Sequence, residues 1–187
     1  MARAFVAVVP PRDVLDAVGK ISWRAAHRPS ELALPRLLGP RWTTREQWHL
    51  TLQFLGNGVD LEAAAAALAT VRGAASAVRL GGVGGFPTEK RAAVVWVGVR
   101  EGARELSAVA AAVKESMLPV VPEPDPREYH PHLTLARLAR GADLRAAAAG
   151  RTPIGPRWIA DRITLFESVS AASGHHYRAH AQITLSG

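Results

Sequence analysis

The chain contains the same tetrapeptide twice, as His49-Leu50-Thr51-Leu52 and as His132-Leu133-Thr134-Leu135. In an extended strand, alternate side chains point to the same face. Each copy therefore presents a histidine and a threonine on one face and two leucines on the other. Two imidazoles and two hydroxyls that converge on one cleft would suit attack on a phosphodiester without a metal ion.

The two histidines could divide the proton transfers of such a reaction. An unperturbed imidazole titrates near pH 6.5, so close to neutrality one histidine can be a base while the other is an acid. Hydrolysis of a cyclic phosphate needs both, because water loses a proton as the leaving oxygen gains one. Thr51 and Thr134 could donate hydrogen bonds to the non-bridging oxygens. Symmetry of sequence alone does not decide which histidine, His49 or His132, is the acid.

A metal site is not expected. The chain has no cysteine, so a zinc site would draw only on histidines and carboxylates. His130 and His132 alternate, but Pro131 lies between them and no suitably placed carboxylate is near in sequence. The aromatic candidates for stacking on a terminal base, or for ordinary packing, are Trp42, Phe86 and Tyr129.

Composition indicates one globular domain over residues 1–187, since 48% of the residues are hydrophobic and 21% are charged. The net charge is +7 and lysine occurs at only three positions, so most of the 23 basic residues are arginine. Arginine binds phosphate bidentately, which favours an anionic partner such as RNA. A GC-rich genome would explain the excess of arginine and alanine equally well. Residues 1–10 are too short, and too soon broken by proline, for a signal peptide or a membrane span, so we expect a cytoplasmic protein.

Periodicity predicts the same order of elements twice. Each half has a helix, a strand with the tetrapeptide, another helix and further strands. The residues 29–47 and 118–129 are rich in proline and charge, resist assignment, and are predicted to form the rims of the site. Strands are predicted over 4–9, 48–55, 78–83, 93–99, 132–138, 159–169 and 177–185, the last two as a hairpin around 171–174, and helices over 11–28, 60–74 with Asp60 as cap, 101–117 and 144–149.

These residues resemble the 2H phosphoesterases, which are defined by two His-x-Thr/Ser-x motifs, and within them the bacterial RNA 2′,3′-cyclic phosphodiesterase or 2′-5′ RNA ligase family. The resemblance extends almost from end to end. It includes residues 3–7 with Pro10-Pro11, residues 48–56, residues 85–87 with 94–99, residues 129–137, and residues 165–168 with Tyr177.

The resemblance implies a bilobal α+β fold, with two antiparallel sheets and flanking helices around a central cleft in a pseudo-twofold arrangement. It implies metal-independent opening of 2′,3′-cyclic phosphate ends of RNA to 2′-phosphates, and in some members 2′-5′ joining of tRNA halves. His49 would be the proton donor and His132 the proton acceptor, with Thr51 and Thr134 on the phosphate. No cofactor is expected, and we expect a monomer acting on RNA ends, including tRNA fragments.

Arg137 lies five positions after His132, where similar enzymes place a phosphate-binding arginine. An odd offset sends a side chain to the opposite face of a strand, so the strand must bulge or end near Ala136 for Arg137 to reach the cleft. Two other functions stay open at this stage. The chain could act on a small cyclic nucleotide, or it could bind phosphorylated RNA ends without turnover.

Overall fold

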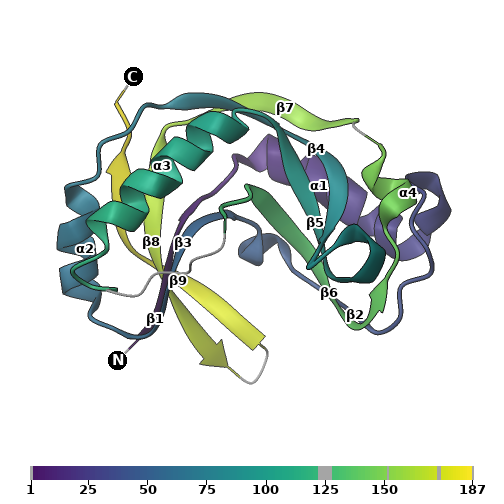
Figure 1. Cartoon of the computed structure of the whole chain (residues 1–187), viewed down its shortest axis with the longest axis horizontal. Coiled ribbons are helices and arrows are strands. Elements are labelled where there is room, and N and C mark those ends of the chain that lie inside the picture. Colours follow the sequence, from purple (N-terminus) through teal and green to yellow (C-terminus); the bar gives the residue numbers. More distant parts are fainter. Residues whose placement is uncertain (1, 122–127, 151, 172–173, 187) are drawn as a thin grey trace.

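The computed structural model describes residues 2–121, 128–150, 152–171 and 174–186. These residues form a curved, antiparallel, nine-stranded sheet with helices packed against it (Figure 1). The strands are β1 Ala2–Val8, β2 Pro40–Trp42, β3 Leu50–Val59, β4 Ser76–Phe86, β5 Ala92–Glu101, β6 His132–Ala142, β7 Pro153–Ala160, β8 Arg162–Ala171 and β9 Gly174–Thr184. The helices are α1 Arg12–His27, α2 Leu61–Ala69, α3 Ala103–Ser116 and α4 Arg145–Ala148, with short 3₁₀ turns η1 Pro29–Leu32, η2 Arg45–Gln47 and η3 Glu89–Arg91.

The strand order gives the sheet its pseudo-twofold character. It runs β7-β4-β5-β6-β3-β1-β8-β9, with β2 added beside β6, so the two strands that carry the tetrapeptides are central neighbours. The seam between β6 and β3, joined through the pair Leu50 and Leu133, has β3, β1, β8 and β9 on one side and β6, β5, β4 and β7, together with β2, on the other. The predicted α+β class is confirmed, and its two sheets are the halves of one curved sheet because this pair connects them.

Helices cover one face of the sheet. In Figure 1, α2 and α3 lie over the half that contains β1, β3, β8 and β9, while α1 lies against β7. The first helix packs against the core through Val14 and Val18, which are fully inaccessible to solvent. Asp60 caps α2, because its carboxylate accepts hydrogen bonds from the backbone N–H groups of Glu62 and Ala63. None of the described helices is both long and apolar enough to cross a membrane.

The sequence prediction missed two strands. β2 lies within the unassigned residues 29–47, where a three-residue strand is too short to show a period. β7 contains Pro153 and Pro156, which argue against a central strand, and it is an edge strand paired only with β4 in the sheet order. The strand predicted over 159–169 therefore divides at Asp161 into the end of β7 and the start of β8.

The predicted closing hairpin is confirmed. β8 and β9 pair from Arg162 with Thr184 to Ala171 with Gly174, and the hairpin projects from the body of the molecule (Figure 1). Residues 172–173 of its predicted turn, and residues 122–127 of the second unassigned segment, lie outside the described residues.

Candidate active site

Both tetrapeptides have the side-chain alternation that the sequence predicts. The four leucines are at most 3% exposed, while the two histidines and two threonines are partly exposed. All four polar side chains therefore share the face of the sheet opposite the leucine core.

The pairing between β3 and β6 brings the two motifs together. Leu50 lies opposite Leu133, and the chains run antiparallel. From this pair, Thr51 continues toward His132 and Thr134 continues toward His49. The two histidines are close enough that the charge of His132 lowers the pKa of His49.

A β-bulge in β6 decides where Arg137 points. Residues 95 and 96 of β5 pair with Ala136 and Thr134, so Leu135 is an extra residue on β6. Leu135 and Ala136 are both buried, and the exposed Arg137 then returns to the face that carries Thr134. The charge of Arg137 contributes to lowering the pKa of His132. Of the two possibilities that the sequence allows, a bulge or a strand end near Ala136, the structure has the bulge, and Arg137 lies on the face of the sheet that carries the histidines.

β3 has the matching irregularity in the other half. Thr51 and Gln53 pair with consecutive residues of β1, so Leu52 is the extra residue. The next side chain is Phe54, which is 49% exposed. Phe54 thus occupies the pseudo-twofold position of Arg137. Both half sites have a bulged backbone after the threonine, but the side chain that follows is aromatic in one and positively charged in the other. The repeated tetrapeptide does not reveal this asymmetry.

Aromatic side chains hold the ring of His49. Phe5 stacks on it with ring centroids 4.6 Å apart, and Tyr177 meets it edge-on at 5.2 Å. Burial lowers the pKa of His49 to about 4, while a hydrogen bond to the backbone of Gln47 opposes that shift. His49 is therefore neutral at pH 7 in the free protein.

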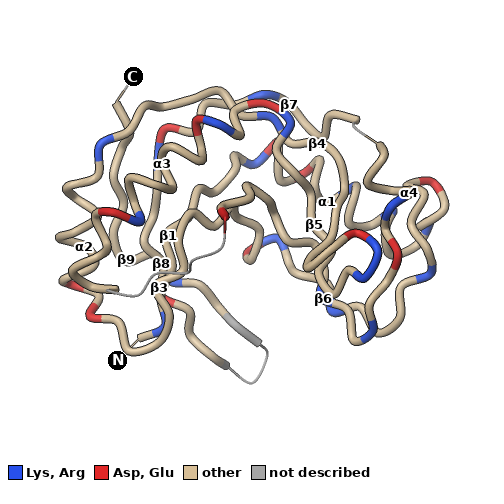
Figure 2. Tube along the Cα trace, viewed as in Figure 1, with Lys and Arg blue, Asp and Glu red and all other residues tan. Residues whose placement is uncertain are grey.

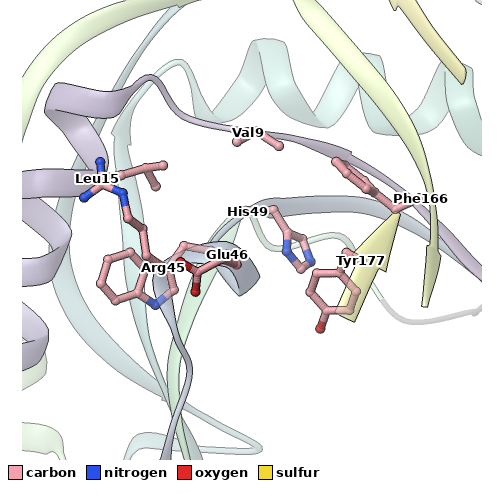
Figure 3. Close-up of a pocket in the computed structure, with 8 residues that line it drawn as sticks. Val9, Leu15, Arg45, Glu46, His49, Phe166 and Tyr177 are labelled. Atoms are coloured by element: carbon pink, nitrogen blue, oxygen red, sulfur yellow. The ribbon is translucent and has the colours of Figure 1, made fainter. Parts of the chain in front are cut away.

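A cavity of about 390 Å³ opens beside His49. Figure 3 shows the ring of His49 between Glu46 and Tyr177, with Phe166 farther along the same wall. The cavity is lined by Val9, Leu15, Arg45, Glu46, Trp48, His49, Phe166 and Tyr177.

The ring of His132 has a defined orientation. Its Nδ1 lies 2.7 Å from the carbonyl oxygen of His130. A carbonyl only accepts, so Nδ1 donates and the neutral ring keeps its lone pair on Nε2. Phe86 meets the ring edge-on at 4.8 Å, and Trp96 lies 6.1 Å away. Burial is the main cause that lowers the pKa of His132, and the charge of His130 adds to it.

Thr43 connects the two motifs, and the sequence analysis missed it because it lies in the unassigned residues 29–47. Its N–H donates to the carbonyl of Leu135 at 2.8 Å, and its hydroxyl lies 2.8 Å from the carbonyl of Thr134. The same hydroxyl accepts a hydrogen bond from the indole N–H of Trp48 at 2.9 Å. Because Trp48 precedes His49, one side chain ties the backbone of the second motif to the approach to the first.

The other candidates have less direct positions. Trp42 and Tyr129 are partly buried and pack against the core, and Phe86 lies in the aromatic group around His132. Within the described parts of the chain, no three histidine, cysteine or acidic side chains gather as a metal site would require. The residues the sequence analysis used only for resemblance, Phe5 and Tyr177, form the wall of His49.

Comparisons with known proteins show which family the chain belongs to. An RNA 2′,3′-cyclic phosphodiesterase of Aeropyrum pernix is 38% identical over 103 residues, which are 54% of this chain and 58% of that protein. An RNA 2′,3′-cyclic phosphodiesterase of Escherichia coli (strain K12) is 31% identical over 142 residues, covering 75% of this chain and 74% of that protein. The crystal structure of E. coli LigT in apo form superposes with a TM-score of 0.73 at 27% identity, covering 100% of this chain and 98% of that one. A family model for the 2′-5′ RNA ligase superfamily matches residues 14–171, and the chain therefore belongs to that superfamily, as the resemblance of its two motifs to the 2H phosphoesterases predicts.

Proposed function

We propose that this chain hydrolyses 2′,3′-cyclic phosphate ends of RNA to 2′-phosphomonoesters without a metal ion. The observation that carries the proposal is the placement of two His-x-Thr motifs on one face of neighbouring strands, about the pair Leu50 and Leu133. Two similar proteins bear the name RNA 2′,3′-cyclic phosphodiesterase, which supports this choice of reaction.

His132 is the proposed general base. Its Nδ1 donates to the carbonyl of His130, which leaves the lone pair of Nε2 to take a proton from water. The water oxygen then bonds to phosphorus as the bond from phosphorus to the ribose 3′ oxygen breaks. The product keeps its phosphate on the 2′ oxygen.

His49 is the proposed general acid, which protonates the departing 3′ oxygen. Its pKa of about 4 in the free protein means that it must gain a proton when substrate binds. An anionic phosphate beside the ring stabilises the imidazolium and raises its pKa, so the substrate itself charges the acid.

Thr51, Thr134 and Arg137 are the proposed phosphate ligands. The two hydroxyls donate to the non-bridging oxygens, whose charge grows in the transition state. Arg137 supplies a charge-assisted hydrogen bond from the side of His132, whose pKa already responds to it.

We further propose that the substrates are RNA ends, including tRNA fragments, and that the protein acts on them as a monomer in the cytoplasm. With the 5′-hydroxyl of a second RNA end as the nucleophile in place of water, the same displacement of the 3′ oxygen would join two RNA ends through a 2′-5′ bond. The support is the similarity to named phosphodiesterases and the net charge of +7, which favours an anionic partner.

The test uses an oligoribonucleotide with a 2′,3′-cyclic phosphate end, incubated with the protein in EDTA. Phosphorus NMR of the product should show a 2′-phosphomonoester, and His49→Ala and His132→Ala serve as matched controls. A 3′-phosphate product, or activity lost in EDTA and restored by a divalent ion, would contradict the mechanism. Binding without turnover would indicate a module for phosphorylated ends instead.

A further inference from the structure

Two arginines lie directly opposite each other beside the candidate site. Arg41 on β2 and Arg137 on β6 are Cα partners in an antiparallel ladder, so their side chains project to the same face. The neighbouring pair, Trp42 and Ala136, faces the other way, since Ala136 is fully buried and Trp42 packs against the core. Arg41 therefore lies on the face that carries Arg137 and the motif histidines.

This arrangement is unfavourable unless an anion is present. Like charges directly opposite each other destabilise a ladder. Some surface arginines lie beside carboxylates that offset their charge, as Arg45 does with Asp16 and Arg178 with Glu167. Among the residues that the structure describes, neither Arg41 nor Arg137 has an ion pair. Figure 2 shows further basic positions at the end of the molecule where β2 and β6 lie.

A single cyclic phosphate does not account for both guanidinium groups. It carries one negative charge, and the proposed site already offers it Thr51, Thr134 and Arg137. Arg41 lies one strand beyond Arg137, at the side of β6 away from β5. An RNA end carries a second phosphate, the phosphodiester on the 5′ side of its terminal nucleotide, whereas a mononucleoside cyclic phosphate does not.

We propose that Arg41 binds this second phosphate, so that the opposed arginines select an RNA end over a mononucleoside cyclic phosphate. The inference rests on the proposed function and specifies its substrate class. Guanidinium groups bind phosphodiester oxygens by bidentate, charge-assisted hydrogen bonds. The contact between Arg41 and the second phosphate is equally strong in the ground state and in the transition state, because this phosphate does not react. Its loss should therefore raise KM and leave kcat unchanged.

The test compares three substrates: adenosine 2′,3′-cyclic phosphate, the dinucleotide ApA with a 2′,3′-cyclic phosphate end, and the same dinucleotide with a neutral methylphosphonate linkage. The wild-type protein should hydrolyse the charged dinucleotide with about tenfold higher kcat/KM than the other two, as a charge-assisted bond gives. Arg41→Gln should abolish this preference. Arg104→Gln, which removes the same charge from an exposed position on α3, should keep it.

Salt provides a second measurement. Loss of one phosphate contact should make the KM of Arg41→Gln for the charged dinucleotide depend less on salt than that of the wild type, because one attraction that salt screens has been removed. A preference that survives Arg41→Gln, or a methylphosphonate dinucleotide as good as the charged one, would overturn the inference while leaving the proposed function intact. Failure of all three substrates with the wild-type protein would instead contradict the proposed function.

Discussion

Leu50 and Leu133 face each other across the seam between β3 and β6, and each is the residue that follows a histidine of the site. Their side chains are fully buried in the core. The pair thus lies on the pseudo-twofold axis and sets the separation of the two His-x-Thr motifs. The proposed acid and base each adjoin a fully buried leucine of the sheet, which favours a preorganised site.

We expect His49→Ala and His132→Ala each to lower kcat by about 10²- to 10⁴-fold. The double variant should be little worse than either single one, because both groups act in one step. Single-turnover kinetics on a 2′,3′-cyclic phosphate end measures this. Strictly additive losses, or a histidine that tolerates alanine, would rule out the paired mechanism.

The pH dependence should report the low pKa values of both histidines. Burial lowers both below the ordinary value of 6.5, so kcat/KM, which reports the free enzyme, should be bell-shaped with its maximum below pH 6.5. The kcat profile should lie at higher pH, because the bound anion raises these pKa values. Coincident profiles would contradict charging of His49 by the substrate.

The free energy of unfolding should depend on pH through His49. A native pKa of about 4 means that the folded chain binds fewer protons than the unfolded chain between pH 6.5 and 4, so stability falls as pH falls through that range. At about 1.4 kcal/mol per unit, the loss at His49 is about 2–3 kcal/mol. Urea denaturation at pH 7 and pH 4.5 should show a smaller loss for His49→Gln than for the wild type, and equal losses would contradict the shift.

Product binding should separate the phosphate ligands. Arg137→Ala removes a charged donor, whereas Thr51→Val and Thr134→Val each remove a neutral hydrogen bond of about 0.5–1.5 kcal/mol. Titration with a 2′-phosphate product should therefore show the largest loss of affinity for Arg137→Ala. Wild-type affinity and turnover in that variant would remove Arg137 from the site and leave both His-x-Thr motifs in place.

Thr43→Val should act on positioning rather than on binding. The variant keeps the shape of the side chain but loses the hydroxyl that links Trp48 to the carbonyl of Thr134. We expect kcat to fall about tenfold or more with little change in KM, since small misplacement of an acid or base is costly. Thr43→Ser, which restores the hydroxyl, should recover kcat. Failure of Thr43→Ser to recover it would reduce Thr43 to a packing role.

The local pattern was sufficient to predict the two half sites. Strict alternation of histidine, leucine and threonine has one structural solution, because leucines bury and the intervening polar side chains must then share the other face. The main helices and the closing hairpin follow from period and capping for the same reason, and Asp60 is an example. These are properties of neighbouring residues along the chain.

The tertiary structure decided what depends on neighbouring strands. Alternation alone sends Arg137 away from the site, and only pairing with β5 creates the bulge that returns it. The link through Thr43, the aromatic wall of His49 and the pairing of Arg41 with Arg137 join residues distant in sequence. The difference between Phe54 and Arg137 at matching positions also appears only when the two registers are compared. Sequence repeats describe each strand by itself, whereas register between strands is fixed by the packing of the whole sheet.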